Sequence, residues 1–207
     1  MPGTDIEDSL YFLKRFIRGP RQVASVWPSS RFLAREMFAD LNLGDGDVVV
    51  EYGPGTGAFT REVERLIQAG RGIRYLGVEK DPGMHDFLEA RFPELDFALG
   101  DARDVLAHCA DRNLPPATAV ISGLPLILFG RPTVEAIVDA TGRCLRPDGV
   151  FRTFSYVHSY PTRGADDLRQ VMFEYFQHFE LSRPVIRNLP PAMTLTGRSP
   201  IPIASAA

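Results

Sequence analysis

The chain contains the stretch DVVVEYGPGTG at Asp47–Gly57, in which a run of β-branched residues leads directly into a glycine-rich turn. β-Branched residues favour strands, and an unbroken apolar run is typical of a strand buried on both faces of a parallel sheet. Glycine lets the backbone turn tightly and approach a bound ligand closely. We therefore expect a central strand at 47–52 and a ligand-binding turn at its carboxyl end.

Strand-like and helix-like segments alternate through much of the remaining sequence. Such alternation is typical of an α/β fold in which helices cross between parallel strands. The proline-containing segment after His178 suits an antiparallel hairpin at a sheet edge, because proline cannot donate a ladder hydrogen bond. The expected elements are strands at 74–79, 95–99, 117–122 and 150–157, helices at about 58–69, 82–92, 102–109, 133–145 and 166–178, and a turn at 146–149.

Length and composition exclude several classes of protein. The 207 residues suit one domain with a short extension, and 44% hydrophobic residues exclude a disordered chain. We expect no transmembrane segment and no signal peptide, since no apolar run approaches about 18 residues and the chain starts with acidic residues. Cys109 and Cys144 are too few for a disulfide framework or a four-cysteine zinc site, so we expect two core thiols in a reducing cytoplasm.

A basic segment precedes the expected sheet. Ser9–Arg35 contains six cations and no acidic residue, although the net charge of the whole chain is −3. Within Leu10–Gly19 the apolar residues are spaced for one helical face and the cations lie elsewhere around the helix. A helix of this kind can adsorb to an anionic membrane, cover a ligand pocket or pack on its own sheet.

Acidic residues follow two of the expected strands. Glu79 ends the strand at 74–79, where a carboxylate can accept hydrogen bonds from the ribose hydroxyls of a nucleoside cofactor. Asp101 follows the next strand and can accept from an adenine amino group, while the Ala102 N–H donates to the ring. Taken alone, Asp101 is also a good helix N-cap. Because the carboxyl ends of parallel strands share one edge of a sheet, we expect both carboxylates to lie beside the glycine turn.

The turn is compatible with two cofactors. Gly53, Gly55 and Ala58 can be read as a dinucleotide fingerprint. Pro54 and Gly57 fit S-adenosylmethionine better, because this ligand has no pyrophosphate and requires room only for an amino-acid tail and a ribose. The candidate cofactor-binding residues are Glu51, Gly53, Pro54, Gly55, Thr56, Gly57, Glu79, Lys80, Asp101, Ala102, Ser122 and Gly123.

Five motifs in this order resemble those of class I S-adenosylmethionine-dependent methyltransferases: Glu51–Gly57, Glu79, Asp101, Ser122–Leu126 and Leu145–Gly149. The resemblance covers about residues 47–157. It implies a Rossmann-like α/β fold with a mostly parallel seven-stranded sheet and an antiparallel edge hairpin. It also implies S-adenosylmethionine as the cofactor. We assign 41–207 to this methyltransferase domain and 1–40 to a basic, helical lid or membrane element.

Three further motifs resemble the bacterial phospholipid N-methyltransferases: Val26–Ser30, Ser122–Pro125 and Arg187–Ala192. This resemblance implies methylation of phosphatidylethanolamine toward phosphatidylcholine. It also implies a basic N-terminal helix, similar to Leu10–Arg18, that adsorbs to anionic membrane. We therefore expect a phospholipid substrate and a peripheral location on the cytoplasmic, inner face of the membrane. The sequence indicates no protein partner and makes nucleic acid an unlikely one.

A competing resemblance is to the ribosomal RNA adenine dimethyltransferases, which share the style of the glycine turn. Those enzymes carry an Asn-x-Pro-aromatic motif that holds and stacks a flipped adenine. Here the segment Ser122–Leu126 contains neither the Asn nor the aromatic residue. A small-molecule methyltransferase is a further alternative, and a non-catalytic module that binds S-adenosylmethionine or lipid is the alternative outside enzymes.

Methyl transfer to an amine depends mainly on orientation, because water can accept the proton that the amine loses. Tyr156 and His158 are the first catalytic candidates: Tyr156 to hold an ammonium and His158 to take a proton. Tyr11 in the N-terminal segment is a third. The candidate substrate-binding residues are Leu124, Pro125 and three arginines whose guanidinium groups match phosphate oxygens, Arg21, Arg31 and Arg187. We expect no metal site.

Overall fold

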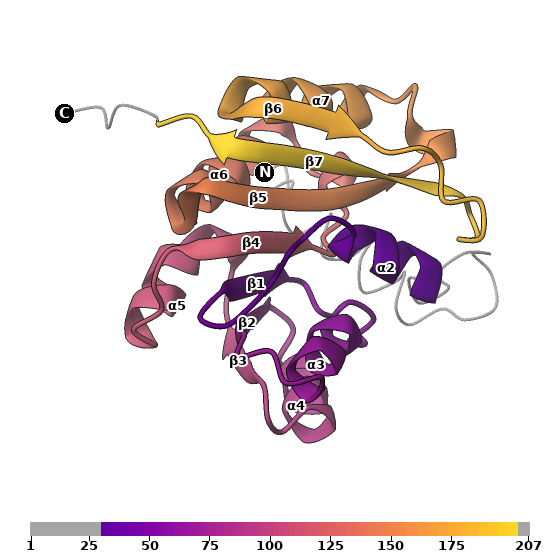
Figure 1. Ribbon diagram of the computed structural model, residues 1–207. Coiled ribbons are helices and arrows are strands. Elements are labelled where there is room, and N and C mark those ends of the chain that lie inside the picture. Colours follow the sequence, from indigo (N-terminus) through magenta and orange to yellow (C-terminus); the bar gives the residue numbers. More distant parts are fainter. Residues whose placement is uncertain (1–29, 203–207) are drawn as a thin grey trace, which may run out of the picture.

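The computed structural model describes residues 30–202 and contains one seven-stranded sheet (Figure 1). The strands are β1 Val48–Tyr52, β2 Arg74–Glu79, β3 Asp96–Leu99, β4 Ala117–Ser122, β5 Leu145–Tyr156, β6 Phe176–Leu181 and β7 Ala192–Pro200. Their order across the sheet is β3-β2-β1-β4-β5-β7-β6. Strands β1 to β5 pair in parallel, whereas β7 is antiparallel to both β5 and β6. The predicted α/β fold with an antiparallel edge hairpin is confirmed.

Helices cover both faces of the sheet and give three layers (Figure 1). They are α2 Arg31–Phe38, α3 Thr60–Gln68, α4 Pro82–Arg91, α5 Val105–Asp111, α6 Arg131–Cys144 and α7 Arg163–Tyr175, with short 3-10 helices η1 Ala102–Asp104, η2 Leu126–Leu128 and η3 Val157–Ser159. One core cluster packs α2, α3 and α4 on one face, through Leu33, Val63 and Leu88. The other packs α5, α6 and α7 on the opposite face, through Val105 and Leu168 among others.

Most of the predicted elements are present. Strands β2 and β4 have the predicted bounds. Helix α4 begins as its sequence indicates, because the Asp81 carboxylate accepts a hydrogen bond from the Met84 N–H at 3.0 Å and Pro82 lies in the first turn. Cys109 and Cys144 are both buried in the core, as expected, with their Sγ atoms 3.7 Å apart.

Several predicted boundaries differ from the observed ones, and two of these differences have a clear physical cause. The helix predicted at 166–178 runs from Arg163 to Tyr175, because the Thr162 side chain caps its start and Phe176 already pairs with β7. The turn predicted at 146–149 lies inside β5. There Leu145 pairs with Ala117 and Val150 with Ala119, so the intervening residues form an irregularity in the ladder.

A buried arginine fastens α2 to the sheet. Arg152 in β5 is 4% exposed, and its guanidinium donates to the carbonyl oxygens of Glu36, Met37 and Ala39 at 3.1, 3.3 and 2.6 Å. Carbonyls at the C-terminal end of a helix have no partner within the helix, and a cation there also complements the helix dipole. Helix α2 is therefore part of the packed body of the protein.

The helix predicted at Leu10–Arg18 lies outside the described residues, as do Tyr11 and Arg21. The proposed division into 1–40 and 41–207 stays a prediction. Within residues 30–202, no helix combines the length and the hydropathy that crossing a bilayer requires.

Candidate active site

The glycine-rich turn lies at the carboxyl end of β1, between β2 and β4, where the order of the strands reverses. Open α/β sheets bind ligands at this point. Gly53, Gly55 and Gly57 have φ values of +61°, +55° and +79°, a region that other residues rarely adopt. A Cβ on Gly123, after β4, would lie 2.7 Å from the Gly53 carbonyl oxygen. The backbones at the two strand ends are therefore in close contact beside the turn.

Glu79 at the end of β2 holds this turn. Its Oε2 accepts from the Gly55 N–H at 3.1 Å, and its Oε1 accepts from the N–H groups of Lys80 and Asp81 at 2.9 and 3.0 Å. A carboxylate offers about four acceptor positions, so three backbone donors leave one for a ligand. One ribose hydroxyl can take that position directly, and a second would exchange with the Gly55 N–H.

Asp101 is the most heavily engaged carboxylate of the site. It accepts from the Lys80 Nζ at 3.0 Å and from two side-chain nitrogens of Arg103 at 2.9 Å. Burial raises the pKa of Asp101, but the bonds from Arg103 and Lys80 outweigh burial and hold this pKa well below its usual range. The Arg103 N–H also donates to Asp101, which makes Asp101 the N-cap of η1. Its role toward adenine, with buried Ala102 beside it, stays a prediction.

Glu51 is fully buried beneath the turn. Its Oε2 accepts from the Tyr75 hydroxyl at 2.7 Å and from the Thr60 hydroxyl at 2.9 Å. Burial raises the pKa of Glu51 to about 7, although these hydrogen bonds oppose the shift. Its Oε1 is buried without a partner among the described residues. An unpaired carboxylate oxygen under a glycine turn fits a cofactor that brings an ammonium group, as S-adenosylmethionine does.

The end of β4 supports the turn. Ser122 is fully buried, and its hydroxyl accepts from the Leu124 N–H at 3.3 Å. The Gly123 N–H donates to the Tyr52 carbonyl at 2.8 Å. Ser122 and Gly123 therefore shape the backbone beside the site, while Leu124 and Pro125 are half-buried and Thr56 is exposed.

Aromatic rings lead from the glycine turn to the end of β5. Phe59 lies edge-on to Phe154 with 5.9 Å between ring centroids, and Phe154 lies edge-on to Tyr156 at 5.7 Å. Tyr156 stacks on exposed His158 at 5.6 Å with 10° between the ring planes. Burial raises the pKa of the Tyr156 hydroxyl. Tyr156 and His158, two of the predicted catalytic candidates, are thus adjacent at the end of β5.

Sequence reasoning missed Phe59 and Phe154, which continue this row. Phe154 stands two residues before Tyr156, so the alternation of side chains along a strand places both on one face of β5. Phe59 directly precedes α3, two residues after Gly57. The strand alternation was a usable signal for Phe154, whereas the Phe59 contact depends on tertiary packing.

Two of the predicted substrate-binding arginines meet on one ring. The Arg31 and Arg187 guanidinium carbons lie 5.0 and 5.2 Å from the centroid of the Phe32 ring. Nearby, the Ser30 N–H donates to the Asn188 Oδ1 at 3.0 Å. The start of α2 and the loop before β7 are therefore joined. We did not predict this structural link through Asn188, which is 4% exposed.

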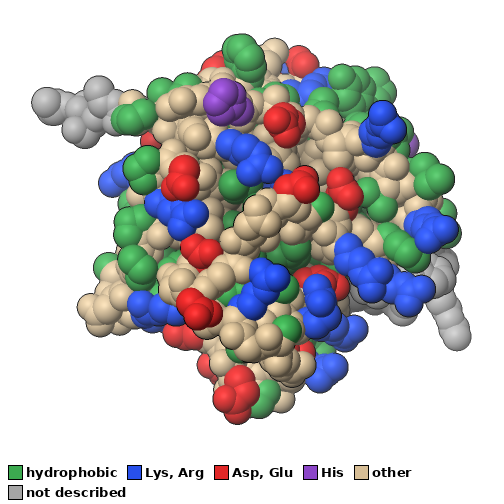
Figure 2. Space-filling model, in the orientation of Figure 1, with side chains coloured by type: hydrophobic (Ala, Val, Ile, Leu, Met, Phe, Trp, Pro, Cys, Tyr) green, Lys and Arg blue, Asp and Glu red, His purple; other side chains and the backbone are tan. Residues whose placement is uncertain are grey.

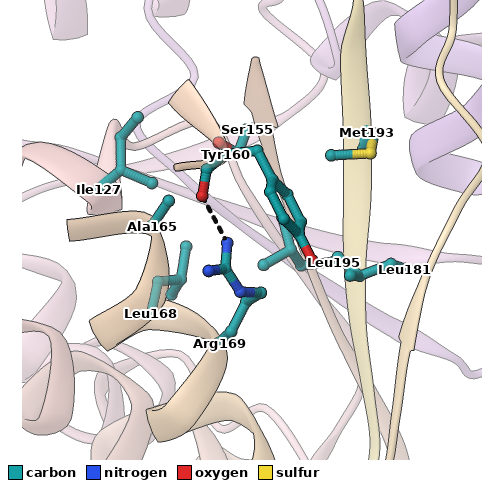
Figure 3. Close-up of a pocket in the computed structure, with 9 residues that line it drawn as sticks. All are labelled: Ile127, Ser155, Tyr160, Ala165, Leu168, Arg169, Leu181, Met193 and Leu195. Atoms are coloured by element: carbon teal, nitrogen blue, oxygen red, sulfur yellow. Dashed lines mark hydrogen bonds between the residues drawn. The ribbon is translucent and has the colours of Figure 1, made fainter. Parts of the chain in front are cut away.

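A separate, very small hollow lies between α7 and the sheet (Figure 3). Leu168, Ser155 and Met193 line it, and the Arg169 guanidinium lies 4.2 Å from the Tyr160 ring centroid. Because Ser155 and its neighbour in β5 point to opposite faces, this hollow lies across the sheet from the aromatic row. It is not part of the candidate active site.

Three side chains on α4 bring potential metal ligands within 4.8 Å of one another: His85, Asp86 and Glu89. Asp86 and Glu89 are exposed, and each lies within 4.0 Å of the His85 ring nitrogen. Exposed acidic groups on a helix are common without a metal, so this cluster alone does not indicate a metal site. The absence of a metal site stays a prediction.

Comparison with known proteins identifies a relative that matches almost the full chain. The chain is 30% identical over 190 residues to ornithine lipid N-methyltransferase of Singulisphaera acidiphila, which covers 90% of this chain and 94% of that relative. It is 26% identical over 140 residues to ribosomal RNA small subunit methyltransferase A of Thermotoga maritima. That match covers 66% of this chain and 46% of the relative, so the chain spans about half its length. No protein-family model matches.

Solved structures support the fold. An S-adenosylmethionine-dependent O-methyltransferase of Thermotoga maritima superposes with a TM-score of 0.61 at 14% identity, covering 93% of this chain and 72% of that one. A TehB-like S-adenosylmethionine-dependent methyltransferase of Corynebacterium glutamicum gives a TM-score of 0.54 at 13% identity, covering 94% and 99%. At these identities the likeness establishes the architecture alone.

Proposed function

Because this chain is a class I S-adenosylmethionine-dependent methyltransferase that belongs to the family of ornithine lipid N-methyltransferase, we propose that it methylates the head-group amine of a membrane lipid. The observation that carries the proposal is the 30% identity along 94% of that relative. The match to ribosomal RNA small subunit methyltransferase A covers only 46% of that enzyme. It therefore supports RNA methylation less strongly than the full-length match supports lipid methylation.

Two lipid head groups are the candidates. Ornithine carries an amine and a carboxylate, and phosphoethanolamine carries an amine and a phosphate. Arg31 and Arg187, held together on Phe32, can pair with either anion through guanidinium hydrogen bonds. We place ornithine lipid first because of the full-length relative, and phosphatidylethanolamine, which the sequence motifs predict, second.

Different residues at the carboxyl edge of the sheet are assigned to different parts of the cofactor. When bound, S-adenosylmethionine supplies an electrophilic methyl group on a sulfonium centre. We assign the unpartnered Glu51 Oε1 to the ammonium of the cofactor and the free acceptor position of Glu79 to a ribose hydroxyl. Asp101 and the Ala102 N–H are assigned to the adenine. The glycine turn provides close backbone approach.

The residues at the end of β5 act on the acceptor amine. A protonated amine has no lone pair, so it must lose one proton before it can take a methyl group. The Tyr156 ring face can hold the ammonium, and the stacked, exposed His158 can accept the proton and pass it to water. Tyr11 lies outside the described residues, and its role stays a prediction.

A lipid substrate requires contact with a membrane surface. The basic segment Leu10–Gly19 supports peripheral adsorption to anionic lipid on the inner face of the cytoplasmic membrane. On this account the protein needs neither a nucleic acid nor a second protein for its reaction.

The test is a labelled-methyl assay with the purified full chain. S-Adenosylmethionine with a labelled methyl group is offered separately with vesicles containing ornithine lipid, vesicles containing phosphatidylethanolamine, and small-subunit ribosomal RNA. We expect label in the organic phase with ornithine lipid. Label with phosphatidylethanolamine alone would select the second head group. Label in RNA alone, or cofactor binding without label in any acceptor, would overturn the proposal.

A further inference from the structure

The loop between β6 and β7, residues 182–191, lies at the same edge of the sheet as the candidate active site. Ala192, the first residue of β7, pairs with Tyr156, the last residue of β5. The loop therefore ends beside the last residue of β5, and Figure 1 shows it in gold at the right of the molecule, beside α2. Any surface that presents a lipid head group to Tyr156 must come close to this loop.

This loop exposes two large apolar side chains. Ile186 is 74% exposed and Leu189 is 69% exposed. Arg183 and Arg187 are exposed beside them, and the chain contains no acidic residue after Glu180. Apolar side chains flanked by cations, with no acid among them, match the chemistry of an anionic bilayer: acyl chains below and negative head groups above.

Hydrogen bonds at the base of the loop hold Ile186 and Leu189 at the surface. Buried Asn188 accepts from the Ser30 N–H at 3.0 Å and donates to the Pro190 carbonyl at 2.7 Å. The Val185 N–H donates to the Ala192 carbonyl at 2.7 Å. Because these bonds hold the backbone on both sides of Asn188, the loop cannot turn its apolar tips inward without breaking them.

The adjoining helix α2 contributes further exposed cations. Arg187 shares the Phe32 ring with Arg31, and Arg35 is exposed one turn further along α2. Figure 2 shows Lys and Arg side chains gathered over α2 on the right of the molecule, with hydrophobic side chains exposed beside them. Arg31 and Arg35 therefore continue the cationic surface of the loop onto α2.

We infer that the β6–β7 loop is a docking surface for an anionic lipid bilayer, with Ile186 and Leu189 in the acyl boundary and Arg183, Arg187 and Arg31 at the head groups. This inference rests on the proposed function, because a lipid substrate is what brings a bilayer to this edge. It uses no residue of Leu10–Gly19, the stretch assigned above to membrane adsorption. It positions the open end of β5 directly at the membrane surface.

The first experiment measures insertion of the loop itself. Cys109 and Cys144 are buried, so a cysteine introduced as Ile186→Cys can be labelled with an environment-sensitive fluorophore. Phe173→Cys is the matched control, because Phe173 is also 74% exposed and lies near the end of α7, toward the opposite edge of the sheet. Vesicles of phosphatidylglycerol and phosphatidylcholine should shift the emission to the blue at 186 and leave it unchanged at 173. No shift at 186, or equal shifts at both sites, overturns the inference.

The second experiment measures the energetic contribution of the two side chains. Ile186→Gln with Leu189→Gln should weaken sedimentation with the same vesicles by about tenfold, whereas Phe173→Gln should not. The affinity of the double variant for S-adenosylhomocysteine should stay within about twofold of wild type, which shows that it is folded. Unchanged vesicle affinity of the double variant contradicts the inference. These vesicles contain no methyl acceptor, so the result does not depend on the methylation assay, which tests the proposed function alone.

Discussion

The Gly55 N–H donates a hydrogen bond to the Glu79 Oε2 across 3.1 Å, and this contact joins the glycine turn after β1 to the carboxyl end of β2. The shape of the turn and the position of the ribose acceptor are therefore not independent. Any change at Glu79 acts on both, because the same carboxylate also accepts from the N–H groups of Lys80 and Asp81.

Replacing Glu79 by Ala should weaken binding of S-adenosylhomocysteine by at least about tenfold, since a hydrogen bond to a charged acceptor contributes roughly 1.5–3 kcal/mol. Isothermal calorimetry measures the change. Glu94→Ala is the control, because Glu94 is an exposed acid in the loop before β3. Equal affinities for wild type and Glu79→Ala would show that Glu79 does not contact the cofactor.

Replacing Gly55 by Ala should abolish cofactor binding while only moderately lowering stability. The positive φ of +55° costs a side chain about 1–2 kcal/mol. Gly46→Ala is a matched control, since Gly46 has a φ of +83° and a Cβ there meets nothing within 4 Å. Urea denaturation should give similar losses for both variants. Calorimetry should show lost affinity for S-adenosylhomocysteine in Gly55→Ala alone, and a parallel loss in Gly46→Ala would refute a local role for the turn.

The buried Glu51 should make stability depend on pH. Burial raises its pKa from 4.5 to about 7, so the folded chain keeps a proton that the unfolded chain releases. The stability associated with that proton is fully present below about pH 4.5 and is lost as pH rises through about 7. The unfolding free energy of wild type minus that of Glu51→Gln should therefore fall by about 3 kcal/mol across this range. Denaturation curves at a series of pH values measure this difference, and a constant difference would contradict the raised pKa.

Removing the Arg152 guanidinium should destabilise the protein. Arg152→Met removes the donor to the Met37 and Ala39 carbonyls at the end of α2, which should cost about 3 kcal/mol. Urea denaturation measures the loss. Arg61→Met, at an exposed position on α3, should change stability by less than about 0.5 kcal/mol. Equal effects of the two substitutions would mean that Arg152 does not fasten α2.

The central part of the fold could be predicted from local sequence, because β-branched and aromatic residues, bounded by glycine or aspartate, mark β1, β2 and β4. The boundary between α7 and β6 could not. Phe173, Phe176 and Phe179 recur every three residues and therefore fit the helical period. The pairing of Phe176 with Pro200 in β7 overrides that local preference and starts a strand there.

The candidate site shows the same division. Glu79, Asp101 and the glycine turn could be found because each follows a strand in a recognisable order. The link between Ser30 and Asn188 could not be found, since it joins residues 158 positions apart through one hydrogen bond. The nearness of Phe59 to Phe154 likewise depends on how α3 packs on β5, which no local pattern specifies.

The most direct test of the central claim locates the transferred methyl group by mass spectrometry. Purified protein is incubated with S-adenosylmethionine and vesicles that contain both ornithine lipid and phosphatidylethanolamine, and the head groups are then fragmented. We predict methylation at the head-group nitrogen by the wild-type chain and at least about tenfold less product with Glu79→Ala at limiting cofactor. A protein that binds S-adenosylhomocysteine but leaves both head-group nitrogens unmethylated would contradict the assignment of this chain as a lipid N-methyltransferase.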